Sequence, residues 1–238
     1  AAKREADVAL TNGMARALTS PTPADPQAIH AILLKPVADH CNLRCKYCYE
    51  GIGSERFQPG QMSPDLLRKV IAEGCAQAPN NRIQFLWHGG EPLLAGLDLF
   101  RVGVDQQRIE RQASGIEISN SVQTNGTLLD DRWLDCLQDS GFSIGISLDG
   151  PPAIHDAERI DAKGQGTHHL VVEAIHRIQA RNMEFGVIAV ISPHHVPHAA
   201  EVVRHFYDLG IRNLDMHPAV GLPKEDANPQ NNGDLSPD

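Results

Sequence analysis

Short apolar runs alternate with longer amphipathic stretches along most of the chain. The apolar runs predict six strands, at 29–35, 82–87, 116–122, 142–148, 184–191 and 212–216. The stretches between them predict helices at 63–77, 97–112, 133–139, 170–180 and 197–209. Because successive parallel strands need a crossover between them, this alternation predicts an α/β fold built on a parallel sheet.

Residues at the segment ends support these boundaries. Ser63 and Pro64 are typical of the first positions of a helix, Asp130 precedes another, and Gly141 and Gly210 follow the last turns of two more. Six units are too few for an eight-stranded barrel. Periodicity alone leaves a doubly wound flat sheet as an alternative.

Polarity changes at both ends of the chain and predicts three regions. Residues 1–28 read as an N-terminal arm and linker, because a poorly periodic helix pattern at 1–20 is followed by a Pro-rich stretch. Residues 29–220 contain all six predicted strands and form the core. Residues 221–238 are rich in Asn, Pro and Asp and read as a polar linker or tail.

Composition limits the class of protein. A chain of 238 residues suits one domain, and its 30 acidic and 21 basic residues argue against a broad nucleic-acid surface. The sequence has no run of 18 apolar residues and no signal-like N-terminus, so we expect no membrane span and a cytoplasmic protein. The chain does not begin with Met, which suggests a longer parent.

Three of the five cysteines lie in one short segment with the spacing C-x3-C-x2-C: Cys41, Cys45 and Cys48. Thiolates are the ligands of iron–sulfur clusters, and three of them would leave one iron of a [4Fe–4S] cluster open. A zinc site that includes His40 or His88 is the alternative, although paired zinc-ligand spacing is absent. Cys75 and Cys136 fall in predicted helices, where we expect small buried side chains.

The residues around the cysteines extend the pattern. The segment CNLRCKYCY at 41–49 is followed in order by WHGGEPL at 87–93, QTNGTL at 123–128, GISLDGP at 145–151 and HDAER at 155–159. This ordered set resembles the radical S-adenosylmethionine (SAM) enzymes, closest to the SPASM-type branch of anaerobic sulfatase-maturating enzymes and peptide maturases. The resemblance covers roughly residues 29–220 and implies a partial (β/α)6 barrel.

The resemblance also implies two cofactors, a [4Fe–4S] cluster held by the three clustered cysteines and SAM. The implied SAM contacts are Tyr47, Gly89, Gly90, Glu91, Gln123, Asn125, Ser147, Arg159 and Ile188. Gly89 and Gly90 would let the backbone approach the ligand, and Glu91 would shape their turn. Arg159 would pair with the SAM carboxylate. The alternative is a structural role for Arg159, in a surface salt bridge to Asp156 or Glu158.

The remaining implied contacts follow the strands. Ser147 matches a position that touches the ribose, while Tyr47 and Ile188 match positions that pack on the adenine. Gln123 and Asn125 are predicted to share one face of their strand, by alternation, and to reach SAM or substrate. A turn role for Asn125 is the alternative.

Two groups of polar residues are harder to interpret. Asp215 and His217 share a face of the sixth strand and are candidates for lining the substrate cavity, against a purely structural role. The three histidines His194, His195 and His198 invite a metal interpretation. Without acidic or cysteine partners, we expect them on a solvated surface.

By resemblance, the enzyme would cleave SAM reductively, and the resulting 5′-deoxyadenosyl radical would modify a side chain of a peptide or protein. An electron donor such as flavodoxin or ferredoxin would be needed. The alternatives are a glycyl-radical-activating enzyme, a small-molecule radical SAM enzyme, and a non-catalytic iron–sulfur scaffold.

Overall fold

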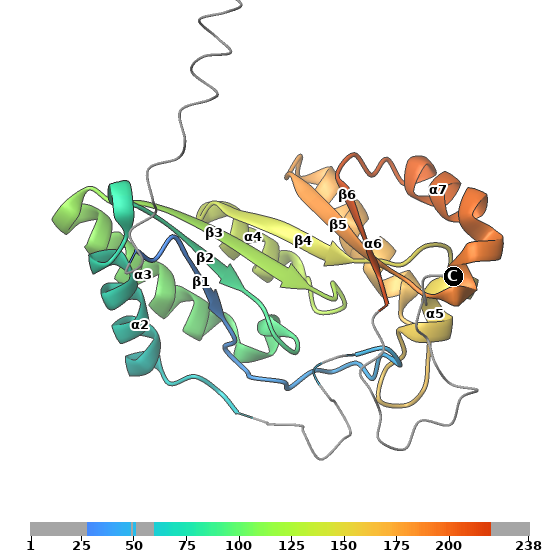
Figure 1. Ribbon diagram of the computed structural model, residues 1–238, viewed down its shortest axis with the longest axis horizontal. Coiled ribbons are helices and arrows are strands. Elements are labelled where there is room, and N and C mark those ends of the chain that lie inside the picture. Colours follow the sequence, from blue (N-terminus) through green and yellow to red (C-terminus); the bar gives the residue numbers. More distant parts are fainter. Residues whose placement is uncertain (1–27, 49, 51–59, 220–238) are drawn as a thin grey trace, which may run out of the picture.

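The structure is a computed structural model that describes residues 28–48, 50 and 60–219. Six strands form one parallel sheet in the order β1-β2-β3-β4-β5-β6 (Figure 1). They are β1 (Ala31–Leu34), β2 (Arg82–Trp87), β3 (Glu117–Thr124), β4 (Phe142–Ser147), β5 (Phe185–Ile191) and β6 (Leu214–Pro218). The predicted parallel α/β fold is confirmed, and each strand lies where the apolar runs placed it, to within about two residues.

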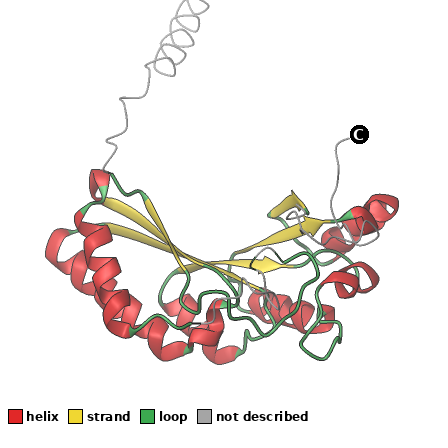
Figure 2. Ribbon diagram, turned by 60° about the horizontal axis from the view of Figure 1, so that its bottom comes forward, coloured by secondary structure: helices red, strands yellow, loops and turns green. Residues whose placement is uncertain are grey.

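Helices follow the strands and lie on one side of the sheet, below it in Figure 2. The α-helices are α2 (Pro64–Ala76), α3 (Leu97–Ser114), α4 (Asp131–Asp139), α5 (Pro152–Glu158), α6 (His168–Ala180) and α7 (Ala199–Asp208). The short 3-10 helices are η1 (Pro79–Asn81), η2 (Pro92–Ala95) and η3 (Pro193–His198). Since β1 and β6 do not pair with each other, the curved sheet is a half-barrel, which replaces the flat doubly wound alternative.

The core lies between the sheet and the helices. Along β2, Ile83, Phe85 and Trp87 alternate toward the helices and are fully buried, while their neighbours are more exposed. Trp87 stacks on Phe100 of α3 with ring centroids 4.3 Å apart. Its indole N–H donates to Oδ1 of Asn120 at 3.1 Å, so this large aromatic group leaves no buried donor without a partner.

The helix signals in the sequence act as predicted. Ser63 Oγ accepts from the Leu66 N–H at 3.2 Å, and Asp130 Oδ1 accepts from the Trp133 N–H at 2.9 Å, so both residues cap their helices. Gly141, just past α4, has φ +68°, which suits a residue without Cβ.

The predicted helix 197–209 is wrong at its start. Residues 193–198 form the 3-10 helix η3, and α7 begins only at Ala199. Ser192 and His195 form a capping box that starts η3, and Pro197 has no N–H to continue an α-helix from the preceding turn. The predicted helix at 1–20 and the predicted tail at 221–238 lie outside the described residues. Within the part of the chain that the structure describes, no helix is long and apolar enough to cross a membrane.

Candidate active site

The cysteine segment directly follows β1 and is tied to the segment after α5. The Arg44 N–H donates to the Ile160 carbonyl at 2.7 Å, and the Lys46 N–H donates to the Glu158 carbonyl at 3.0 Å. Leu43 also forms an isolated antiparallel bridge with Asp161. These backbone contacts hold the cysteines at the carboxyl edge of the sheet, which is where ligands bind in parallel α/β folds.

All three clustered cysteines are free thiols in a sheltered environment. Cys41 is buried, and burial, together with nearby charge on Glu91, Cys45 and Cys48, raises its pKa to about 12. Burial also raises the pKa of Cys45 to about 11, against the lowering effect of Arg159. Without a metal these thiols therefore stay protonated, and binding of iron must displace their protons.

The donor set fits an iron–sulfur cluster. The three thiols come from one short segment, whereas Cys75 and Cys136 lie apart on α2 and α4. Among the described residues, no three His, Cys, Asp or Glu side chains are arranged around a single metal ion. Thiols are the donors that iron–sulfur clusters use, so these residues fit a cluster chemically.

The Gly-Gly turn after β2 packs tightly against the cysteine segment. Gly89 has φ +81° and Gly90 has φ +51°. A Cβ on Gly90 would lie 2.1 Å from the His40 carbonyl oxygen, and one on Gly89 would lie 2.3 Å from Cε of Lys35. The close approach that these glycines permit is therefore to Lys35 and the cysteine segment. Contact of this turn with SAM stays a prediction.

Glu91 joins this turn to the end of β3. Its side chain is fully buried and accepts three hydrogen bonds, from the Leu93 N–H at 3.1 Å, the Thr124 hydroxyl at 2.8 Å and the Asn125 N–H at 2.8 Å. Burial raises the pKa of Glu91 to about 7, while these three donors act to lower it. Glu91 thus shapes the turn through its own contacts.

Gln123 and Ser147 meet across neighbouring strands, whereas Asn125 is placed differently. Gln123 Nε2 donates to Ser147 Oγ at 3.1 Å, and the space that Gln123 fills exists because Gly145 has no Cβ. β3 ends at Thr124, so strand alternation does not place Asn125. Its amide instead donates to Oδ1 of Asn42 at 2.9 Å and reaches Sγ of Cys41 at 3.7 Å.

A buried ion pair lies beside the cysteines. Arg159 donates from Nε and Nη2 to the two carboxylate oxygens of Asp149, at 2.8 and 3.2 Å. The Tyr47 hydroxyl donates to the same carboxylate at 2.5 Å, and the Arg159 guanidinium lies 5.3 Å from the Tyr47 ring centre. The alternative of a surface salt bridge between Arg159 and Asp156 or Glu158 is therefore wrong.

Charge and burial act against each other within this cluster. Burial raises the pKa of Asp149, but the Arg159 charge and the hydrogen bonds that the carboxylate accepts outweigh it, so its pKa is lowered overall. Burial raises the pKa of Tyr47 well above the ordinary value. Asp149 stands in the sequence block 145–151, but nothing in the sequence identified it as the partner of Arg159.

Two histidines support the backbone of Asp149. His195 is buried, and its Nε2 donates to the Asp149 carbonyl at 2.9 Å while its Nδ1 accepts from the Ser192 N–H at 3.1 Å. The expectation of a solvated surface is wrong for His195, although His194 and His198 are exposed. His155 Nδ1 accepts from the Asp149 N–H at 3.3 Å.

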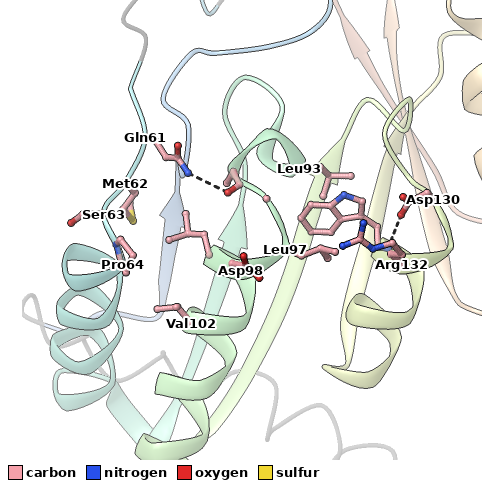
Figure 3. A pocket seen from close by; sticks show the side chains of 14 residues that line it. Gln61, Met62, Ser63, Pro64, Leu93, Leu97, Asp98, Val102, Asp130 and Arg132 are labelled. Atoms are coloured by element: carbon pink, nitrogen blue, oxygen red, sulfur yellow. Dashed lines mark hydrogen bonds between the residues drawn. The ribbon is translucent and has the colours of Figure 1, made fainter.

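The open face of the sheet carries a cavity of about 1000 Å³ along β3 to β6, lined by both polar and apolar residues. Gln123, Ile188 and Asp215 line it, and Ile188 is paired in register with both Ser147 and Asp215. His217 is exposed farther along β6 and is not among the lining residues. A second hollow of about 740 Å³ lies where α2, α3 and α4 begin (Figure 3), and none of the predicted site residues lines it.

The family profile and the sequence relatives of this chain indicate the same family. The profile of the Radical SAM superfamily matches residues 36–207. The serine-type anaerobic sulfatase-maturating enzyme of Klebsiella aerogenes is 34% identical over 200 residues, which cover 83% of this chain and 48% of that protein. The cysteine-type enzyme of Clostridium perfringens is 34% identical over 187 residues, which cover 77% of this chain and 50% of the relative.

Solved structures agree with the sequence relatives. The enzyme anSMEcpe with bound AdoMet superposes with a TM-score of 0.80 at 31% identity, over 86% of this chain and 56% of that one. Its complex with AdoMet and the Cp18Cys peptide gives 0.79 at 30% identity, over 87% and 55%. The chain thus spans about half the length of the relatives it matches.

Proposed function

The chain belongs to the radical SAM superfamily, whose cofactors are a [4Fe–4S] cluster and SAM. We propose that it cleaves SAM reductively and modifies a side chain of a peptide or protein. The observation that carries the proposal is the meeting of four separate segments of the chain at one edge of the half-barrel. The cysteine segment contacts the Gly-Gly turn, the end of β3 and the segment after α5.

Cys41, Cys45 and Cys48 are the proposed ligands of the cluster. When bound, the cluster supplies the electron for cleavage of SAM and an open iron for its chelation. The protein must hold the three thiolates in place and exclude water around them. The burial of Cys41 and the backbone bonds of Arg44 and Lys46 serve both purposes.

Arg159 is the proposed partner of the SAM carboxylate. Asp149 occupies the Nε–Nη2 edge of the guanidinium, which leaves the opposite edge for a second carboxylate. Ser147, Gly89, Gly90 and Tyr47 are further proposed SAM contacts. Asp149 is a positioning residue in this arrangement, since it acts on SAM only through Arg159 and Tyr47.

The substrate is proposed to be a peptide segment that lies along the open face of the sheet. Support comes from anSMEcpe, whose structures were solved with bound peptides, and from the cavity on this face, which Gln123 and Asp215 line. Serine-type and cysteine-type maturating enzymes both occur among the relatives. A peptide with one central Ser or Cys is therefore the first probe.

The test uses the chain reconstituted anaerobically with iron and sulfide and supplied with SAM and dithionite. Matched peptides carry Cys, Ser or Ala at one position, and both 5′-deoxyadenosine and peptide mass are followed. We expect a mass change in the Cys or Ser peptide that grows with 5′-deoxyadenosine and is absent from the Ala peptide. Formation of 5′-deoxyadenosine with every peptide unchanged would favour a small-molecule substrate or a glycyl-radical partner.

The electron donor in the cell is proposed to be a flavodoxin or ferredoxin. Replacing dithionite by each reduced protein, at equal reducing equivalents, tests this proposal. The expected result is SAM cleavage with at least one of the two.

A further inference from the structure

We propose that Asn125 sets the reduction potential of the cluster by donating an N–H···S hydrogen bond to the sulfur of Cys41. The inference rests on the proposed function, because it needs Cys41 as a cluster ligand. It assigns Asn125 to the cluster side of the site, as a positioning and tuning residue, rather than to SAM or substrate.

Two N–H groups approach the Cys41 sulfur. The Leu43 N–H lies 3.3 Å from Sγ, and Nδ2 of Asn125 lies 3.7 Å from it. Cys41 and Asn125 are both only 8% exposed, so little water competes for the sulfur. A buried N–H···S contact is therefore stronger than the same contact in water would be.

The orientation of the Asn125 amide is fixed by its neighbours. The Thr127 backbone N–H, which can only donate, lies 3.0 Å from Oδ1 of Asn125. The oxygen must therefore face Thr127 and the nitrogen must face Cys41, which removes the usual ambiguity of an asparagine side chain.

A closed ring of three hydrogen bonds locks this arrangement. Asn125 Nδ2 donates to Oδ1 of Asn42 at 2.9 Å, Asn42 Nδ2 donates to Oγ1 of Thr127 at 2.8 Å, and the Thr127 hydroxyl donates back to Oδ1 of Asn125 at 2.7 Å. One N–H of the Asn125 amide is used in the ring. The second N–H is left to the sulfur of Cys41.

The direction of the effect follows from charge. Reduction adds negative charge to the cluster and its thiolates, and an N–H that points at a thiolate stabilises this charge. The contact thus raises the reduction potential, which eases reduction of the cluster by its electron donor and makes the reduced cluster a weaker reductant toward SAM. Loss of the N–H should make the potential more negative, and a carboxylate in its place should shift it further.

The test is an EPR redox titration of anaerobically reconstituted wild type, Asn125→Ala, Asn125→Asp and Thr127→Val, with iron and sulfide measured per chain. Gln106→Ala is the matched control, because it deletes an amide on α3 that bonds to Glu110. Thr127→Val breaks the ring without touching Cys41, and so loosens the amide in place.

We expect the midpoint potential to fall in the order wild type, Asn125→Ala, Asn125→Asp, at unchanged iron content. Thr127→Val should fall between wild type and Asn125→Ala, and Gln106→Ala should match wild type. A full iron load with an unchanged potential in both Asn125 variants would overturn the inference. Loss of the cluster in Asn125→Ala and Thr127→Val alike would also overturn it, in favour of a purely structural role. Failure of wild type to bind iron would instead contradict the proposed function.

Discussion

Asp149 is the residue on which most of the described site converges. Its carboxylate accepts from Arg159, Tyr47 and the Val190 N–H, and its backbone bonds to His155 and His195. A buried charge is tolerated only when such partners surround it. Removing the charge of Asp149 leaves the Arg159 guanidinium buried without a counter-ion.

We expect Asp149→Asn to lower both stability and SAM affinity. Breaking a buried ion pair from one side costs about 3–5 kcal/mol of unfolding free energy, and a loosened Arg159 should weaken SAM binding by roughly ten-fold or more. Thermal unfolding of the metal-free chain and equilibrium binding of SAM to the reconstituted chain measure the two effects. Arg181→Ala is the control, since its ion pairs with Asp131 and Asp135 lie on the surface. A SAM affinity equal to wild type would contradict the role given to Asp149.

His155 makes the site sensitive to acid. Burial, together with the nearby Arg159 charge, lowers its pKa to about 3. The pKa of His155 in the folded chain lies below the ordinary value near 6.5. Between the two pKa values the imidazole is therefore protonated in the unfolded chain and neutral in the folded chain. The stability that His155 contributes is thus complete above pH 6.5 and is lost as the pH falls toward 3.

The corresponding prediction compares wild type with His155→Gln in the metal-free state. The Gln side chain can still accept from Asp149 and donate to Thr167, but it does not titrate. The difference in unfolding free energy between the two proteins should change by about 1.4 kcal/mol per pH unit below pH 6.5. Denaturant titrations between pH 7 and pH 4 give this slope. Parallel curves would show that His155 is not the group responsible.

At the scale of elements, contact between α3 and β2 is unusually close. A Cβ on Gly103 of α3 would lie 2.7 Å from the ring of Trp87. Trp87 is fixed by its stacking on Phe100 and by its hydrogen bond to Asn120. The ring therefore has little room to move away.

Gly103→Ala should consequently destabilise the fold, although alanine is the better helix former. The gain in helix propensity is about 1 kcal/mol, whereas overpacking of a core costs about 1–3 kcal/mol. Chemical denaturation of the two proteins decides the sign. A stabilised Gly103→Ala variant would mean that the Trp87 ring moves away from the added methyl group at little cost in free energy.

The helices and strands that the sequence predicts are those whose bounds are set by a local pattern of residues. β2 was predicted to the residue because its alternating pattern ends at the Gly-Gly turn. α5 was missed because seven residues are too few to give a helical period. The burial of His195 was unpredictable because it depends on the Asp149 carbonyl, 46 positions away in the chain.

The candidate site likewise contains residues that type and spacing predict and contacts that only the fold creates. The three cysteines and the Gly-Gly turn carry their chemistry in residue type and spacing, so the sequence predicted them. The partners of Arg159 and Asn125 are set by how separate segments meet, and only the fold brings them together. Resemblance to a family therefore named the segments of the candidate site without giving the contacts inside them.

At the scale of the whole molecule, the curved sheet carries the cavity that is proposed to hold the substrate. Asp215 lines it from β6, while His217, two residues farther along the same strand, does not. The two side chains form a matched pair for testing where the substrate lies. Both are exposed, so neither substitution should affect the fold.

We expect Asp215→Ala to raise the KM for the peptide substrate by several-fold, without affecting SAM cleavage in the absence of peptide. His217→Ala should leave both quantities unchanged. Steady-state kinetics with whichever of the Cys and Ser test peptides is modified measures the difference. An effect of equal size in the two variants would place the peptide elsewhere.

If the three clustered cysteines hold a cluster at which SAM is cleaved, loss of one of them must end SAM cleavage. The most direct measurement is iron per chain together with 5′-deoxyadenosine formed from SAM and dithionite, for wild type, Cys45→Ala and Cys136→Ala. The account predicts about four irons and steady product for wild type and Cys136→Ala, and no product for Cys45→Ala. Undiminished 5′-deoxyadenosine from Cys45→Ala would contradict it.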